Sequence, residues 1–353
     1  MMVMTTTGGS SWRRICRRRL STATPAPVSR CRTRAGEYGD VPASGMSGGG
    51  RSVRFVSDLD AVAPGAPFGV AWPEVLSGAT AANVLDRVDR AGCAEHLVAI
   101  RCPFNVFEAV PSEVVDLVSS RGVTLVADRA LLLKNRRPGS SQATFTKLRS
   151  TLSPHAEMDL VKLVRNGFNS IMYLESQARK ADNLPADVRE GLTWAHRMAA
   201  KYDQIMNLYV WERALRDRIR PSLDRALEYL HADKARTDWA SRYKEAFETF
   251  LYRFTLAVEH AAFHENAAVN ALLDEACPAL RHIECVETKA ATIIHAAGAD
   301  VLFSPDSTID VSFAGAFALS REDARQALKV IADAPRLYFE ETEGEKTVAL
   351  LPC

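Results

Sequence analysis

The chain alternates short apolar strands with short helices, but the alternation stops for roughly 120 residues in its middle. Between Ser153 and about Cys277 there is hardly a strand signal, and apolar residues recur at spacings of three and four. Such spacing predicts helices with one apolar face. Strands that alternate with helices imply a parallel sheet of right-handed βαβ units. The chain is therefore predicted to be an α/β protein with a large all-helical insertion.

Four strands are expected in the α/β part, because four short, mostly apolar segments have the length of buried strands. These segments are 68–72, 97–103, 123–127 and 300–303.

Helices are expected between and after these strands. Pro111 opens one of them at a position where a missing N–H costs nothing, and Gly122 follows its end as a C-terminal cap. The expected helices cover 79–91, 111–121, 287–297, 311–319 and 321–334.

The helical insertion contains two prolines, Pro185 and Pro221, which are expected to divide it into about three helices. Aromatic residues are frequent in its later half. This pattern is more typical of helices that pack on each other than of rings that stack on a ligand. The rings belong to Tyr243, Phe247, Phe250 and Phe254.

The first 36 residues contain eight arginines, no lysine and no acidic residue. This composition is typical of a mitochondrial presequence, and the segment Arg18-Arg19-Leu20-Ser21 resembles a matrix-peptidase cleavage site. A disordered basic arm that binds RNA, and a chloroplast transit peptide, are the alternatives. Cleavage after Leu20 would remove five arginines and change the formal net charge from +1 to −4, which disfavours a body that binds nucleic acid. We therefore expect the protein in the mitochondrial matrix.

The organisation expected along the chain has five segments. They are a disordered presequence (1–36), a Gly/Ser-rich linker (37–52), the first part of the α/β region (53–152), the helical insertion (153–284), and a last part with the final strand and C-terminal helices (285–353). No run of 18 apolar residues exists, so no membrane span is expected. The seven cysteines form no CxxC pair, which is typical of reduced thiols.

The strand segments, in their order, resemble the second half of an aldo-keto reductase. FGVAW is similar to that family's Gly-Val-Ser-Asn strand, RCPFNVFE to its Gln-x-Pro-Tyr-Asn-Leu strand, RGVTLVADRALL to its Gly-Val-x-x-x-Ala…Pro-Leu strand, and VLFSPD to its Val-Leu-x-Gly strand. Lys289 matches a lysine in the helix before that last strand. A long helical insert at this place is similar to the branch related to galactose dehydrogenases. The resemblance covers residues 67–132 and 287–319.

The resemblance implies half of an eight-stranded (β/α)8, or TIM, barrel, with its site at the C-terminal strand ends. The family reduces carbonyls with NADPH, using a tyrosine, a lysine, an aspartate and a histidine from the first half of its sequence. Here about fourteen residues separate the linker from Phe68, which is room for one strand (53–56) but not for four βα units. No catalytic residue is therefore assigned, and the catalytic half is expected to be missing.

The positions that match the family's cofactor contacts carry different residues. Ala71 and Trp72 stand in place of Ser and Asn. Arg101 stands in place of a Gln that offers both a donor and an acceptor, whereas Arg only donates. Asp128 or Arg129 stands in place of an aromatic ring that stacks on the nicotinamide.

The remaining matched positions are Asn105, Ser304 and Asp306. Where the family places basic residues for the 2′-phosphate of NADPH, this chain has Asp306 and Asp310, and carboxylates repel phosphate. No cofactor is therefore expected. We expect the charge of Arg101 to be balanced by a carboxylate such as Asp128 or Glu108.

Three other patterns carry weaker signals. His260 and His264 share one face of a predicted helix at a spacing able to hold a metal, with His282 and Cys285 as possible further ligands. Helical histidines are more often surface or capping groups, so no metal site is assigned. Lys134, Arg136 and Arg137 are expected in a basic surface loop, and Ser140 and Ser141 in a polar loop without the GxSxG context of a nucleophile.

The leading hypothesis is an aldo-keto-reductase-like protein of mitochondria that is catalytically degenerate and acts as a structural or interaction subunit. A half barrel leaves strand edges and an apolar face uncovered, so it should self-associate or join a larger mitochondrial assembly. The surface shared with the partner is expected at Phe247, Phe250, Phe254 and Val258. The alternatives are an active NADP-dependent oxidoreductase with a diverged cofactor site, and an RNA-associated mitochondrial subunit.

Overall fold

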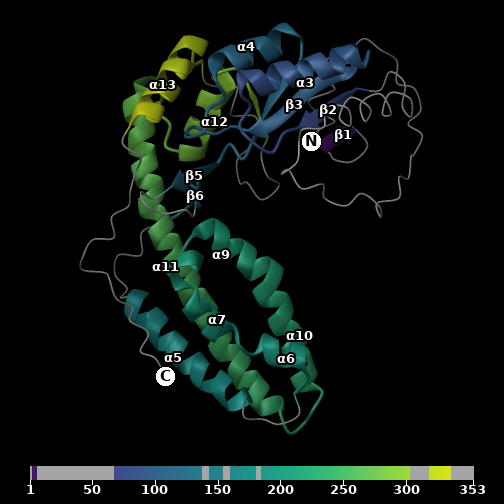
Figure 1. The fold of residues 1–353 in the computed structure, drawn as a ribbon. Helices are drawn as coiled ribbons and strands as arrows, with labels where there is room; N and C mark the ends of the chain where they lie inside the picture. Colours follow the sequence, from purple (N-terminus) through teal and green to yellow (C-terminus); the bar gives the residue numbers. More distant parts are fainter. Residues whose placement is uncertain are drawn as a thin grey trace, which may run out of the picture. The chain divides into compact units, whose positions relative to one another are not determined.

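The computed structural model describes residues 2–5, 67–136, 143–153, 160–179, 184–302 and 318–334 (Figure 1). The chain forms two compact units. The first, which we call the α/β unit, comprises Met1–Ala130 and Ala290–Ala332. The second, which we call the helical unit, comprises Leu131–Lys289 and Asp333–Cys353.

The α/β unit is built on one sheet with the strand order β1-β2-β3-β4-β7. Its last four strands are mutually parallel, as the alternation of strands and helices predicted. Their order in the sheet is also their order along the chain, so the sheet grows in one direction. The parallel strands are β2 (Phe68–Ala71), β3 (Leu97–Pro103), β4 (Thr124–Asp128) and β7 (Asp300–Val301).

The fifth strand corrects one expectation about the leader. Met2–Thr5 form β1, which pairs antiparallel with β2 at the edge of the sheet. An edge strand offers unpaired N–H and C=O groups to any extended segment, and this apolar segment uses them. The prediction that the leader is disordered is therefore wrong for these four residues. The rest of the presequence, the linker and the expected strand 53–56 lie outside the described residues.

Helices α3 (Gly78–Arg90) and α4 (Ser112–Ser120) follow β2 and β3 and lie side by side over the sheet (Figure 1). Ser77 caps α3, because its side chain accepts a hydrogen bond from the backbone N–H of Thr80. Each helix buries one apolar face. The buried residues are Val84, Leu85 and Val88 of α3, and Val114, Val115 and Val118 of α4.

Two further helices complete the α/β region. Helix α12 (Val286–Ala296) precedes β7, and α13 (Arg321–Asp333) is the last described element. Arg325 of α13 pairs with Asp116 of α4. The expected helix at 311–319 lies almost entirely outside the described residues.

A hairpin opens the helical unit, and the sequence reading of this segment was wrong. β5 (Leu132–Arg136) pairs antiparallel with β6 (Ala143–Lys147), so Lys134 and Arg136 belong to a strand and not to a basic loop. β5 reads Leu-Leu-Lys-Asn-Arg and shows no alternation of apolar and polar residues, whereas Thr144-Phe145-Thr146 in β6 are β-branched and aromatic residues that favour strands. Arg137, Ser140 and Ser141 lie outside the described residues.

The helical unit then continues as a series of helices that is more divided than the two prolines predicted. The described elements are α5 (Leu160–Arg179), α6 (Ala186–Gly191), α7 (Trp194–Ala200), α8 (Tyr202–Ile205), α9 (Leu208–Ala214), α10 (Arg220–His231) and α11 (Thr237–Ala276).

Pro221 does not end a helix, contrary to the sequence prediction. It occupies the first turn of α10, and a π-helical segment, Leu215–Ile219, joins α9 to α10 without a break. A proline lacks the N–H of a regular helix turn, and a π turn is one way in which a helix accommodates such an irregularity. Pro185, by contrast, directly precedes α6, as predicted. Other helices are separated at residues such as Asn207, whose side chain caps α9 by accepting from the N–H of Val210.

Aromatic rings form the core of the helical unit, which confirms that they pack helix on helix. Phe168 of α5 lies 4.7 Å from Phe250 of α11 between ring centroids, and Trp211 of α9 lies 4.6 Å from Phe254. Gly167 permits this approach, because a Cβ there would lie 2.7 Å from Cδ2 of Phe250.

The same burial removes the surface expected to face a partner. Phe247, Phe250, Phe254 and Val258 are all buried in the core of their own unit. Helices α5, α9 and their neighbours cover these four residues. The prediction that the four residues form the surface shared with a partner is therefore wrong. None of the helices in the described part of the chain is long and apolar enough to cross a membrane.

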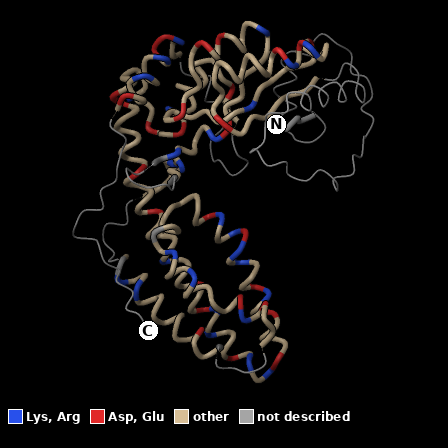
Figure 2. Tube along the Cα trace, in the orientation of Figure 1, with Lys and Arg blue, Asp and Glu red and all other residues tan. Residues whose placement is uncertain are grey.

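Lysine and arginine are interspersed with acidic residues along the helices of the helical unit (Figure 2).

Candidate functional site

The site expected from the resemblance lies at the carboxyl ends of the parallel strands. Backbone hydrogen bonds carry the pairing to these ends: Trp72 N donates to Arg101 O over 2.7 Å, and Phe104 N to Asp128 O over 3.1 Å. Leu302 N likewise donates to Ala127 O over 3.1 Å. The ends of all four strands therefore meet at one edge of the sheet.

The register brings three of the matched residues to one face. Ala71 pairs with Arg101, and Pro103, two residues beyond Arg101, pairs with Asp128. Paired residues of parallel strands project to the same side, as do residues two apart. Ala71, Arg101 and Asp128 consequently lie on the same face of the sheet.

Arg101 and Asp128 form an ion pair across β3 and β4. Nη2 of Arg101 donates to Oδ1 of Asp128 over 2.8 Å, and the two side chains are 24% and 25% exposed. This confirms the expectation that Arg101 is balanced by a carboxylate. The pair neutralises both charges at the place where the resemblance puts a nicotinamide.

The side chain of Asn105 forms its hydrogen bonds within its own loop. Its Oδ1 accepts from Phe107 N over 2.9 Å and from Glu108 N over 3.0 Å, and its Nδ2 donates to Glu108 over 3.3 Å. The side chain is almost fully buried. These bonds close a tight turn after β3, a use of asparagine that is common in loops.

The other matched positions are placed as follows. Trp72 is half buried just after β2. Arg129 has a left-handed backbone with φ of 57°, an uncommon conformation for a side-chain-bearing residue, and its Nε lies 4.0 Å from Asp128. Ser304 and Asp306 lie outside the described residues.

Cys102 lies next to this edge on the other face of β3. Burial, and to a smaller extent the nearby charge of Asp128, raise the pKa of its thiol to about 12. A thiol is a nucleophile only as a thiolate, so Cys102 is inert at neutral pH.

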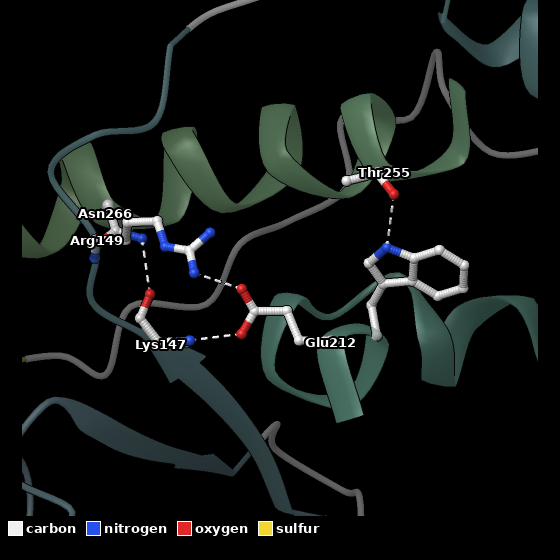
Figure 3. A network of polar contacts seen from close by, with 6 residues as sticks. Lys147, Arg149, Glu212, Thr255 and Asn266 are labelled. Atoms are coloured by element: carbon white, nitrogen blue, oxygen red, sulfur yellow. Dashed lines mark hydrogen bonds and ion pairs between the residues drawn. The ribbon is translucent and has the colours of Figure 1, made fainter. Parts of the chain in front are cut away.

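The helical unit contains a second group of polar contacts, which fastens the hairpin to two helices (Figure 3). Glu212 of α9 accepts from Nζ of Lys147 and from Nη2 of Arg149, both over 2.5 Å. On the opposite side, Asn266 of α11 donates to Lys147 O over 3.1 Å and accepts from Arg149 N over 2.8 Å. β6 and the residues after it are thus held between α9 and α11.

A third group surrounds a fully buried carboxylate. Glu175 of α5 is 0% exposed and accepts from Ala195 N over 2.7 Å and His196 N over 3.2 Å, which caps the first turn of α7. His196 Nδ1 lies 2.5 Å and Tyr243 OH 3.3 Å from the same carboxylate. Burial, together with this carboxylate, raises the pKa of Tyr243 well above its usual value. The four groups satisfy the charge and tie α5, α7 and α11 together.

Sequence reasoning missed Glu175, Glu212 and Asn266, although one signal was present. Glu175 follows Phe168 and Ile171 at the seven- and four-residue spacing of the apolar face of α5. A carboxylate at such a position must be paired when the helix packs.

Lys289, matched to a family lysine, is held by α11. It is 1% exposed, donates from Nζ to Asn270 Oδ1 over 2.8 Å, and pairs with Asp274. Its charge is therefore matched within the helical unit and not at the strand ends.

The two histidines considered for a metal do meet. The Nε2 atoms of His260 and His264 lie 3.3 Å apart on α11. Cys285 instead contacts Ser150 and Glu287. Within the described ranges, no group of three or more His, Cys, Asp or Glu residues is arranged to hold a metal ion.

No protein-family model, curated protein or solved structure matches the chain. The resemblance to aldo-keto reductases therefore stays a prediction, which rests on the motifs in the sequence.

Proposed function

We propose that the chain is an aldo-keto-reductase-like protein of mitochondria that acts as a structural or interaction subunit and not as an oxidoreductase. The observation that carries this proposal is the ion pair of Arg101 and Asp128. It lies at the strand ends where the resemblance would place the nicotinamide, and a cofactor amide would have to displace one of its members.

The order of the strands in the sheet also supports the proposed relationship to aldo-keto reductases. Parallel strands added in one direction through right-handed crossovers place their helices on one face, as in one segment of a barrel wall. A half barrel of this kind is part of the proposal, as is the loss of the half that carries the family's catalytic residues.

Cofactor binding tests the proposal most directly. NADPH titrated into the full chain, followed by the fluorescence of its nicotinamide and by calorimetry, should show no binding up to millimolar concentration. The variant Arg101→Gln, which restores the family's residue, is the matched comparison, and it should also fail to bind. Micromolar binding by the unaltered chain would favour the active NADP-dependent oxidoreductase instead.

Association tests the second part. Sedimentation at micromolar concentration should show a self-associated species, or native fractionation of mitochondria should place the chain in a larger assembly. A well-folded monomer that also migrates alone in mitochondrial extracts would contradict the subunit role.

The proposed location has its own test. Residues 1–36 fused to a fluorescent protein should carry it into mitochondria, and glutamate in place of the five arginines before Leu20 should prevent import. Cytosolic fluorescence of the unaltered fusion would contradict the presequence. Import followed by cleavage after Leu20 would also remove β1 and leave β2 as an edge strand.

A further inference from the structure

We propose that His260 and His264 form a two-imidazole clamp for a divalent transition-metal ion on α11. The first argument is the distance between their donor atoms, because the Nε2 atoms face each other at 3.3 Å. A metal bound equally by two imidazoles at about 2.05 Å would then see an N–metal–N angle of about 107°, which is close to tetrahedral.

The second argument is that the turn carrying the pair is fixed in advance. The adjacent residues Glu265 and Asn266 are bound to the hairpin, through Thr146 Oγ1 over 3.0 Å and through the N–H of Arg149 over 2.8 Å. His264 is also packed edge-on against Phe263, with ring centroids 5.4 Å apart. Little ordering is required on binding, which favours affinity.

The third argument is access. His264 is exposed and His260 is half buried. Positions 260 and 264 lie two residues from the buried positions 262 and 266, which is about 160° around a helix. The clamp therefore occupies the side of α11 opposite to the side that holds the hairpin.

The chemistry of the donors selects the class of ion. Imidazole suits Ni²⁺, Cu²⁺ and Zn²⁺, whereas Mg²⁺ and Ca²⁺ prefer oxygen. Without a metal, one Nε2 must donate its proton to the other, since two N–H groups cannot face each other at this distance. The ion takes the place of that proton, which moves to Nδ1 of the same ring as the imidazole changes tautomer, and water completes the coordination.

Calorimetric titration of Ni²⁺ into the full chain, prepared without a polyhistidine tag, tests the clamp. The second imidazole binds within the same molecule, so His260→Ala and His264→Ala should each weaken the site by at least about tenfold. The double variant should bind more weakly than either single one, because it retains neither imidazole. His231→Ala, which changes an exposed histidine of α10, should leave the affinity unchanged.

A spectroscopic measurement gives an independent readout. The electron paramagnetic resonance spectrum of the Cu²⁺-loaded chain should show coupling to two nitrogens, and this coupling should be lost in both single variants. Melting by circular dichroism checks that the alanine variants remain folded. The proposal is overturned if the unaltered chain does not bind Ni²⁺, or if both single variants retain its affinity within about twofold.

Discussion

The two units differ in how far their paired charged groups are removed from water. In the α/β unit, Arg101 and Asp128 pair at a strand end where both remain about one quarter exposed, above a core made mostly of aliphatic side chains. In the helical unit, Glu175 is fully buried beside large aromatic rings and has four hydrogen-bonding groups around it. A polar group in the second setting has no access to water, so its removal costs more. The comparison predicts that single substitutions will destabilise the helical unit more than the α/β unit.

The largest effect is expected from the aromatic core. Phe254→Ala should lower the free energy of unfolding by about 3–5 kcal/mol, because it opens a cavity between Trp211 and Phe250. Val126→Ala in the sheet should cost about 1–3 kcal/mol, since fewer atoms are removed. Urea denaturation followed by tryptophan fluorescence measures both. Equal losses would remove the basis of the comparison.

The next largest loss of stability is expected from a substitution of Glu175. Glu175→Gln keeps the shape but places an NH2 group against N–H donors, so it should cost about 2–3 kcal/mol. The control is Glu190→Gln, which breaks the exposed ion pair with Arg197 and should cost less than about 1 kcal/mol. Similar effects of the two substitutions on the urea midpoint would show that Glu175 is not buried.

Two glycines, one in each unit, sharpen the comparison. Gly167→Ala would bring its Cβ to 2.7 Å from Phe250 Cδ2 and should cost about 1–3 kcal/mol through overpacking. Gly78→Ala, whose Cβ would meet Val114 Cγ2 at 3.9 Å, has room for the methyl group. It should therefore be neutral or slightly stabilising in thermal melts. Tolerance of alanine at both sites would indicate that α5 and α11 pack more loosely than described.

The strand-end ion pair should contribute about 1 kcal/mol, because its members are partly solvated. A double-mutant cycle of Arg101→Met and Asp128→Asn isolates that coupling free energy. A coupling near zero would mean that the two side chains do not meet in solution, and the proposed function would lose its main support.

The last prediction concerns pH. The pKa of Cys102 is raised to about 12 in the folded chain, so its thiol keeps its proton longer than in the unfolded chain. The stability that it contributes is complete at neutral pH and falls once the pH rises above about 8.5–9, where the unfolded thiol ionises. Between pH 8 and pH 10, the unaltered chain should therefore lose more stability than Cys102→Ala. An equal loss in the two proteins would contradict the raised pKa.

The sequence was sufficient for the parallel strands and for the aromatic packing, because both follow from local periodicity. It also placed Asp128, with Glu108, among the candidate partners of Arg101, since the carboxyl ends of neighbouring parallel strands must meet, and the structure selects Asp128. The hairpin was missed because Lys134 and Arg136 looked like a surface loop. In the helical region, Pro185 precedes a new helix as predicted, whereas Pro221 lies within a continuous helix and other divisions fall at caps such as Asn207.

The contacts of the buried polar groups could not be predicted from the sequence, for a different reason. Glu175 and Tyr243 are 68 residues apart, and Thr146 and Glu265 are 119 apart. Their contacts exist only when helices pack at a particular register, and periodicity places each helix face without selecting its partner. His260 and His264 were predicted to share a face because four residues is a local spacing, but their 3.3 Å separation depends on side-chain rotamers.

The pairing of β4 with β7 has a consequence during synthesis. About 170 residues separate the two strands, so one edge of β4 has no β7 to pair with while the whole helical unit is translated. At ordinary rates of translation that interval is about 10–30 s, which is long compared with the folding of most helical domains. If the helical unit folds first, it holds the ends of this connection and reduces the loop that must close. In the meantime the edge is open to other chains, so the nascent protein should depend on chaperones until β7 leaves the ribosome.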